Sequence, residues 1–287
     1  MVSTTPADSI PDAMPDDARR ASSAPRIRLR NALLALCLIG VPLAWSRDPQ
    51  LVWQPLLPIP LLFLGPRGTS RVLVGFAAVI LLIGSGVTTY RVGMAVPDWP
   101  ATFSQNMWTY PYSDMLAEGY GVTLEHVHRV WGSALGLVAI CVVLSCHIYR
   151  ARTGLTLLAW ATLTAVSIQG LVGGTRVLSD SQNLAFLHGV MAQGVVALIV
   201  ALAVVASRTW ERTRPTPSKH ARALYALGPI VAVAVYLQIA MGAWLRHHGE
   251  VAALLIHGTF ALLVVAFVFA NAKVLRDAAL EVEAAGA

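Results

Sequence analysis

The sequence has little charge and little cysteine, and both shortages limit what the protein can be. Only 13% of its 287 residues are Asp, Glu, Lys or Arg, whereas 56% are hydrophobic, and the mean hydropathy is +0.63. A water-soluble domain of this size needs a larger charged surface, so an ordinary soluble globule is excluded. The three cysteines, Cys37, Cys141 and Cys146, all fall in long apolar segments and form no Cys-x-x-Cys pair. Disulfides and cysteine-based metal sites are therefore not expected.

Long stretches without any charged residue indicate the fold class. Six of them have 19 residues or more, namely 72–90, 130–149, 153–175, 181–207, 223–245 and 251–272. Two shorter stretches, 31–46 and 49–66, precede these six. A helix needs about 20 apolar residues to cross roughly 30 Å of hydrocarbon, so each long stretch is sufficient. The stretch 49–66 is rich in proline, which favours either two short spans or a re-entrant pair for residues 31–66. The sequence therefore predicts an all-α integral membrane protein with about eight transmembrane helices.

Basic residues are distributed unevenly between the two sides that these spans define. The chain has 21 Lys and Arg residues against 15 Asp and Glu residues. If both termini lie inside, only five of the 21 basic residues fall outside: Arg47, Arg91, Arg129, Arg176 and Arg246. By the positive-inside rule, the sequence predicts a multi-pass protein of the cell (plasma) membrane with both termini cytoplasmic. This asymmetry accounts for the basic character, so we expect contact with membrane lipid and no nucleic-acid partner.

Histidine is concentrated on the outer side of this topology. Six of the eight histidines fall there, namely His126, His128, His188, His247, His248 and His257. A polar side chain in a membrane-spanning helix is costly unless it has a partner, so a cluster at one depth indicates a functional site. Imidazole is a common axial ligand of haem iron, and the cluster therefore favours haem binding.

A Glu-His-Val-His-Arg segment opens the span that begins at residue 130. Glu125 and His128 are three residues apart and share one helix face, whereas His126 is rotated by about 200° from His128. His128 is therefore the expected ligand. Gly132 lies one turn further on the same face, where the lack of a side chain admits either a flat macrocycle or a closely packed neighbouring helix.

A second histidine and three arginines are expected at the same depth as His128. His188 lies near the outer end of its own span, so the two imidazoles are expected to hold one haem iron between them. Arg91, Arg129 and Arg176 each terminate a span on this side. Guanidinium binds carboxylates at two points, which favours contacts with the haem propionates. The alternative is that these arginines extend to the lipid headgroups.

Two segments of the chain repeat one pattern. In both, a glycine follows a glutamine by four residues and a histidine follows it by 19: the sets are Gln169, Gly173 and His188, and Gln238, Gly242 and His257. Duplication is common in membrane proteins and makes His257 the counterpart of His188. The second copy lacks a Glu-x-x-His helix of its own. A second haem site would therefore need a ligand from His247, His248 or a partner, or it does not exist.

These spans, together with the family resemblance described next, divide the chain into six segments around a four-helix haem-binding bundle and a partial second bundle. They are a disordered cytoplasmic tail (1–28), two additional short membrane spans (29–68), a four-helix catalytic haem-binding half (69–207), a basic cytoplasmic loop (208–221), a helix pair repeating 155–207 (222–275) and a second cytoplasmic tail (276–287).

The order of the motifs resembles the haem A synthase family of cytochrome oxidase assembly proteins. The resemblance covers about residues 72–275 and rests on Gly86-Val87-Thr88-Thr89, the segment from Gly93 to Pro100, the segment from Glu125 to Arg129, the segment from Gln169 to Gly174, His188-Gly189, the segment from Gln238 to Gly242, and His257. It implies two four-helix bundles related by internal symmetry, with haem O as substrate in the first and a haem b in the second.

By the same resemblance, His128 and His188 are the axial ligands of haem O, and Glu125 is the carboxylate beside the methyl group that is oxidised. Gln169 and Gly132 are counted with the three arginines as cofactor-binding residues, and His257 as a further iron ligand. The implied reaction converts the methyl group to a formyl group and so gives haem A. The implied partners are the farnesyltransferase that supplies haem O, the cytochrome oxidase assembly machinery and an electron donor.

The sequence departs from the family pattern at three places. Val96 and Thr102 stand where many relatives carry a cysteine pair, so other contacts must hold the first outer loop. The carboxyl-terminal half has one helix pair instead of two. Residues 31–66 precede the catalytic half, and we hypothesise that they take the place of the missing pair in a second bundle.

Two other functions compete with a membrane oxidoreductase that oxidises haem O. The first is a non-enzymatic bis-histidine cytochrome b or haem-handling assembly factor, which the incomplete second half favours. The second is a transporter or channel in which the outer histidines and arginines bind an anion, although the sequence has no broken-helix substrate site beyond its proline-rich second span.

Overall fold

The computed structural model describes residues 59–213, 218–249 and 251–286, and over these ranges the chain folds almost entirely into helices. Six helical segments are long and apolar enough to cross a membrane: Pro60–Thr89, Tyr120–Ile148, Thr153–Leu178, Gln182–Val205, Ala221–His247 and Val251–Ala284. The predicted all-α membrane fold is therefore confirmed. The first two predicted spans fall at 31–66, of which only 59–66 belong to the described part of the chain, so the count of eight stays a prediction.

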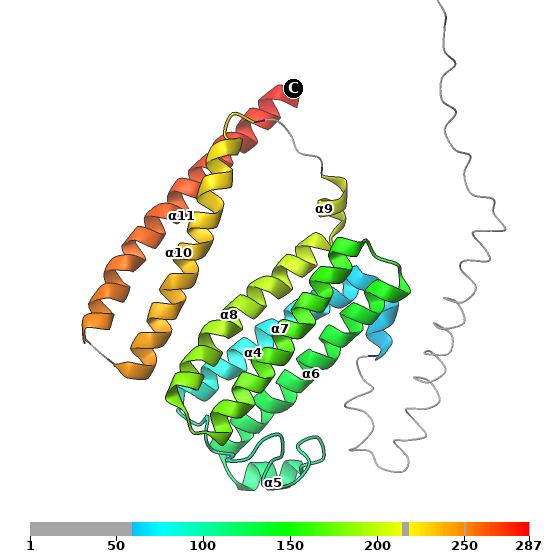
Figure 1. The fold of residues 1–287 in the computed structure, drawn as a ribbon, viewed down its shortest axis with the longest axis vertical. Helices are drawn as coiled ribbons and strands as arrows, with labels where there is room; N and C mark the ends of the chain where they lie inside the picture. The colour runs from blue at the N-terminus through cyan, green and yellow to red at the C-terminus, as the bar shows by residue number, and fades with distance from the viewer. Residues whose placement is uncertain (1–58, 214–217, 250, 287) are drawn as a thin grey trace, which may run out of the picture.

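Four of these helices form a closed bundle (Figure 1). A short 3-10 helix, η2 (Ile59–Leu64), precedes the members, which are α4 (Gly65–Thr89), α6 (Tyr120–Ile148), α7 (Thr153–Leu178) and α8 (Gln182–Val205). Both α4 and α7 pack against α6 and α8. Consequently α6 and α8 face each other along one diagonal of the bundle, and α4 and α7 along the other. Short connections make α6, α7 and α8 antiparallel in succession.

The densest packing lies toward the end of the bundle that carries α9 (Arg208–Arg212). Side chains that are at most 1% exposed there include Leu73, Val138, Val142, Ile199 and Leu202. Ala77, Ala139 and Ala159 are also at most 1% exposed, and their small size lets the helices approach closely. Cys141 and Cys146 are buried in α6, in agreement with their predicted packing role, whereas Cys37 lies outside the described residues.

Two arginines bind the carboxyl-terminal end of α8. Arg67 Nε donates to the carbonyl oxygen of Ala206 at 3.1 Å, and Arg152 Nη2 donates to that of Val205 at 2.7 Å. These carbonyls have no partner within the helix, and the cations also complement the negative end of the helix dipole. Arg67 forms an ion pair with Glu211 as well, which fixes α9 against the bundle.

A loop of residues 90–119 folds over the opposite end of the bundle and includes the short helix α5 (Tyr112–Ala117) (Figure 1). Within it, the Asp98 carboxylate accepts hydrogen bonds from Phe103 N at 3.0 Å and Ser104 N at 2.6 Å. Both donors have positive φ, 50° and 63°, so the carboxylate stabilises a turn that their side chains disfavour. A polar network therefore organises the loop at the place where the family pattern has a cysteine pair.

The last two helices form a separate antiparallel pair, α10 (Ala221–His248) and α11 (Val251–Gly286). As Figure 1 shows, this pair stands beside α8, against which α10 packs. Tyr236 Oη donates to the Val190 carbonyl oxygen at 3.1 Å, and the rings of Phe186 and Trp244 meet edge to face with centroids 5.5 Å apart. Large apolar side chains of α11 stay exposed, as suits a helix that faces lipid.

The hypothesis that residues 31–66 complete a second bundle falls mostly outside the described residues. The described piece, η2, packs against α4 and α6. It therefore lies against the four-helix bundle, and the filling of a second bundle by the preceding residues stays a prediction.

Candidate functional site

A cavity of about 610 Å³ lies among α4, α6, α7 and α8, close to the end covered by the loop. Its volume is within the roughly 300–1,000 Å³ that is usual for small-molecule and cofactor sites. Most of its wall is apolar. Seven of the residues singled out from the sequence line it together: Glu125, His128, Arg129, Gly132, Gln169, Arg176 and His188. The remaining two, Arg91 and His257, lie elsewhere.

His128 and His188 reach the cavity from α6 and α8, which are the diagonal helices of the bundle. A ligand between these helices would therefore have one imidazole on each side. His126, by contrast, does not line the cavity. It is 6% exposed and its Nδ1 is 3.0 Å from Thr102 Oγ1, so it belongs to the packing between α6 and the loop, as its helical rotation predicts.

Each of these imidazoles lies directly against a glycine of a neighbouring helix. A Cβ atom on Gly84 would stand 2.9 Å from His128 Cε1, and one on Gly173 would stand 2.7 Å from His188 Cε1. Real Cβ atoms do not approach other atoms so closely, so both positions require glycine if the rings are to keep their places. Sequence reasoning singled out Gly173 only as part of the repeat, and it missed Gly84.

The two histidines differ in their hydrogen bonds. Gln169 Nε2 is 3.1 Å from His188 Nδ1 and also donates to the His188 carbonyl oxygen at 2.8 Å, which orients that ring. The Nδ1 atom of His128 is buried and has no hydrogen-bond partner among the described residues. A buried polar atom without a partner is unusual, and at a cavity wall it indicates a missing ligand or water.

The same arrangement recurs in the second copy of the repeat. Gln238 Nε2 donates to the His257 carbonyl oxygen at 3.0 Å, and a Cβ on Gly242 would stand 2.9 Å from His257 Cε1. In both halves, therefore, the Gln and Gly of the sequence pattern lie on one helix and contact the His of the next helix. α10 and α11 pack against each other, and α10 also packs against α8.

Glu125 is held by two hydrogen bonds at 3% exposure. One carboxylate oxygen accepts from Arg129 Nη2 at 2.7 Å, and the other accepts from the backbone N–H of Val96 at 3.0 Å. The carboxylate is thus fixed at the cavity wall and its charge is balanced by a buried guanidinium. These contacts make Glu125 both a cavity residue and an anchor of the loop.

Arg129 has a structural task that the sequence did not reveal. Its Nη1 donates to the carbonyl oxygens of Asp98 and Ala101, and its Nη2 donates to that of Val96 as well as to Glu125. All four Nη hydrogens are therefore engaged, three of them by the loop. Of the three arginines expected to bind propionates, Arg129 has the fewest donors left for a ligand.

The loop also closes the cavity with an aromatic ring. Trp99 lines the cavity and lies against Gly174, where a Cβ atom would stand 2.3 Å from the indole ring. The Gly173-Gly174 doublet thus accommodates His188 on one side and Trp99 on the other. The doublet was visible in the sequence, but nothing in its spacing indicated which side chains would occupy the two positions.

The residues that line this cavity fit a haem group. Two imidazoles on opposed helices, a buried ring nitrogen without a partner among the described residues, and open cavity-lining glycines at Gly136, Gly170 and Gly189 match the requirements of a bis-histidine tetrapyrrole site. His128 and His188 would hold the iron there, and haem would supply a redox-active, oxidisable macrocycle.

The glycine at position 84 provides a direct test of this geometry. We expect Gly84→Ala to weaken haem binding roughly 10-fold, because the new methyl group displaces the His128 ring as loss of a supporting group does in other metal sites. Titration of the purified protein with haem, followed by absorbance, measures the change. Gly75→Ala is the matched control on the same helix, since nothing lies within 4 Å of that position. Equal affinities for the two variants would show that His128 does not hold haem.

Comparison with known proteins identifies one relationship. A family model, COX15-CtaA, described as cytochrome oxidase assembly protein, matches residues 69–275. No curated protein and no solved structure matches the chain.

Proposed function

Because the chain belongs to the haem A synthase family of cytochrome oxidase assembly proteins, we propose that it oxidises the methyl group of haem O to a formyl group and so produces haem A. The observation that carries the proposal is the single cavity that His128, His188 and Glu125 line together. A role in cytochrome oxidase assembly follows from membership of the family. The way these three side chains fit the reaction supports the more specific proposal of haem O oxidation.

Each side chain has a definite task in this proposal. His128 and His188 bind the iron from opposite sides and so fix the plane of the substrate. Conversion of the methyl group to a formyl group replaces carbon–hydrogen bonds by a carbon–oxygen double bond, with the oxygen atom taken from water. It releases protons, which need an acceptor, and electrons, which need an oxidant. Among the residues that the structure describes, Glu125 is the only carboxylate on the cavity wall, and its fixed position suits it to accept a proton or to stabilise positive charge on the substrate.

The surroundings of Glu125 support this role. Trp99 and the loop cover the cavity, which limits access of water to the reacting group. Val96 N and Arg129 hold the carboxylate in place before substrate binds. A catalytic group that needs no rearrangement during the reaction lowers the activation barrier more than a mobile group does.

The proposed setting is the cell (plasma) membrane with both termini cytoplasmic, which places the cavity near the outer face. In this scheme a farnesyltransferase supplies haem O, an oxidant accepts the electrons removed from the methyl group, and haem A passes to the cytochrome oxidase assembly machinery. An electron donor is a further partner that the family resemblance implies.

Pigment extraction tests the proposed reaction. We expect cells that make haem O and express this chain to accumulate haem A, detected by chromatography of the extracted pigments, whereas cells that make haem O alone do not. If the purified protein carries haem B and no haem A accumulates, the chain is instead a non-enzymatic cytochrome b or haem-handling assembly factor. The carboxyl-terminal half is the observation that favours this alternative. It keeps the contact between Gln238 and His257, but its described part has only one helix pair.

A further inference from the structure

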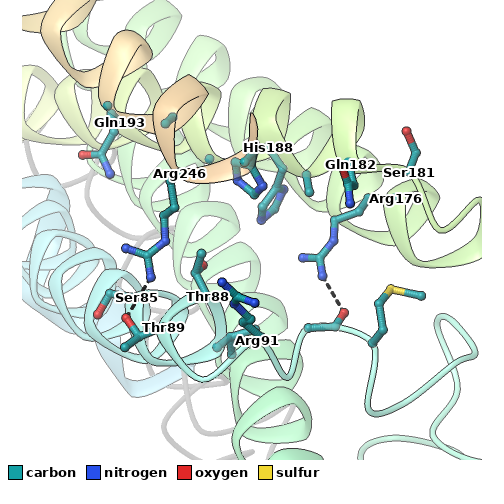
Figure 2. A pocket seen from close by; sticks show the side chains of 18 of the residues that line it. Ser85, Thr88, Thr89, Arg91, Arg176, Ser181, Gln182, His188, Gln193 and Arg246 are labelled. Atoms are coloured by element: carbon teal, nitrogen blue, oxygen red, sulfur yellow. Dashed lines mark hydrogen bonds between the residues drawn. The ribbon is translucent and has the colours of Figure 1, made fainter. Parts of the chain in front are cut away.

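A second cavity of about 890 Å³ lies outside the bundle, between the loop end of α4, α8 and α10. We call it the arginine cleft, because Arg91, Arg176 and Arg246 reach it from three separate segments of the chain (Figure 2). Asp180 is the single acidic residue on its wall within the described ranges of the chain. The cleft is therefore positively charged at the level where the helices end.

Guanidinium groups in the arginine cleft keep donors free for a ligand. Arg246 Nη2 donates to Thr89 Oγ1 at 3.0 Å, and Arg176 Nη2 donates to the Gly93 carbonyl oxygen, so each uses one of its five N–H groups. The guanidinium of Arg91 forms no hydrogen bond or ion pair with any residue that the structure describes, and only its backbone N–H is bonded, to the Thr88 carbonyl oxygen. Figure 2 shows the three side chains directed into the same space.

The backbone at Arg91 adds a second observation. Arg91 follows the last turn of α4 with φ of 56°, a left-handed conformation in which glycine is the usual residue. An arginine at this position brings its side chain to the cleft at a conformational cost, which is typical of functional positions.

The arginine cleft adjoins the bundle cavity. Both are lined by His188, Arg176 and Gln193, and on α4 by Ser85, Val87 and Thr88. A ligand that fills the apolar cavity between His128 and His188 thus has one edge next to the cleft. An apolar ring system with carboxylates along one edge would meet an apolar chamber and a cationic opening together.

We propose that the arginine cleft binds the carboxylate edge of the tetrapyrrole held in the bundle cavity, with Arg246 of α10 joining Arg91 and Arg176 as a carboxylate ligand. This inference rests on the proposed function. Its new element is that the carboxyl-terminal helix pair contributes a binding residue to the first haem site. Arg246 contacts α4 through Thr89, which brings its charge to the edge of the bundle cavity.

The test measures binding by the full-length protein in nanodiscs, without catalysis. Haem B and its dimethyl ester are the probes, because esterification removes both carboxylate charges and leaves the ring and iron unchanged. We expect Arg246→Gln to weaken the binding of haem B about three- to ten-fold, as loss of a partly exposed charge-assisted contact does, and to leave that of the ester unchanged. Arg246→Lys should recover part of the loss.

Arg222→Gln is the matched control, since Arg222 lies on the same helix at its other end. We expect it to bind both probes as the unchanged protein does. Equal losses for haem B and for the ester would overturn the proposal, because they would assign Arg246 a purely structural role.

A lipid headgroup is the other source of an anion at this depth. The binding measurements are therefore repeated in neutral nanodiscs and in nanodiscs that contain phosphatidylglycerol. The Arg246→Gln effect should be the same in both. An effect that appears only with the anionic lipid would show that the cleft binds headgroups and would overturn the proposal. Because no arm requires haem A to form, this inference and the proposed reaction can fail separately.

Discussion

Replacement of His128 by alanine is expected to abolish the low-spin spectrum of bis-histidine haem and to lower haem affinity more than 100-fold. The imidazole of His128 lines the bundle cavity, and under the proposed function it is one of the two iron ligands, so its removal should affect haem far more than the loss of a packing group. Loss of a group that only supports a ligand costs about 10- to 100-fold, and loss of the ligand should cost more. Absorbance titration and electron paramagnetic resonance of the purified protein measure both effects.

His188→Ala should behave in the same way, because His188 faces the cavity from the opposite diagonal helix. His147→Ala is the matched control on α6. His147 lies at the other end of that helix, where its Nε2 accepts a hydrogen bond from Trp160 Nε1 at 3.1 Å. We expect that variant to keep the haem spectrum. A His128→Ala protein that retains a low-spin spectrum would remove the basis for the proposed function.

Glu125→Gln is expected to leave haem bound and to reduce haem A formation by about 10² to 10⁴, the range that a positioned acid–base group typically contributes. The amide has nearly the shape of the carboxylate and can still accept the hydrogen bond from Val96 N. It cannot take up a proton from the substrate. Haem A produced per haem-loaded protein is the quantity to measure, by chromatography of extracted pigment.

The same substitution should lower the thermal stability of the protein. Arg129 is paired with Glu125 at 7% and 4% side-chain exposure, and a buried charge that loses its partner costs about 3–5 kcal/mol. Normalisation to bound haem separates this effect from the effect on the reaction.

Asp98→Asn is the control for the anchoring role of Glu125. Both carboxylates accept hydrogen bonds from the loop backbone, but Asp98 does not line the cavity. We expect Asp98→Asn to lower stability with a much smaller loss of haem A. If the two variants lose haem A equally, Glu125 acts by holding the loop and takes no part in the chemistry.

The comparison of sequence and structure is most informative at Arg129. Its position at the end of a span, next to the ligand histidine, predicted a propionate contact. In the folded chain its Nη hydrogens go to Glu125 and to three loop carbonyls. No periodicity in the sequence could indicate this, because the loop carbonyls that it binds carry no residue-specific signal.

Arg246 illustrates the opposite case. The sequence placed it only as an outer arginine of the second repeat, whereas the structure places it beside α4, bonded to Thr89. A contact between residues so far apart in the chain depends on how α10 packs against α8, and that packing was not encoded in any local pattern.

The sequence alone determined that the chain is an all-α membrane protein, because charge-free stretches long enough to cross hydrocarbon leave no other fold for them. It also determined the faces on which Glu125 and His128 lie and the equivalence of the Gln, Gly and His positions in the two repeats, since both follow from helical periodicity and fixed spacing. Only the tertiary structure decided that α6 and α8 oppose each other across one cavity, that Gly84 lies under His128, and that the arginines divide between the loop and the cleft. These features arise from side chains of different helices meeting at atomic distance, and helix packing, not the order of residues along any one helix, sets those distances.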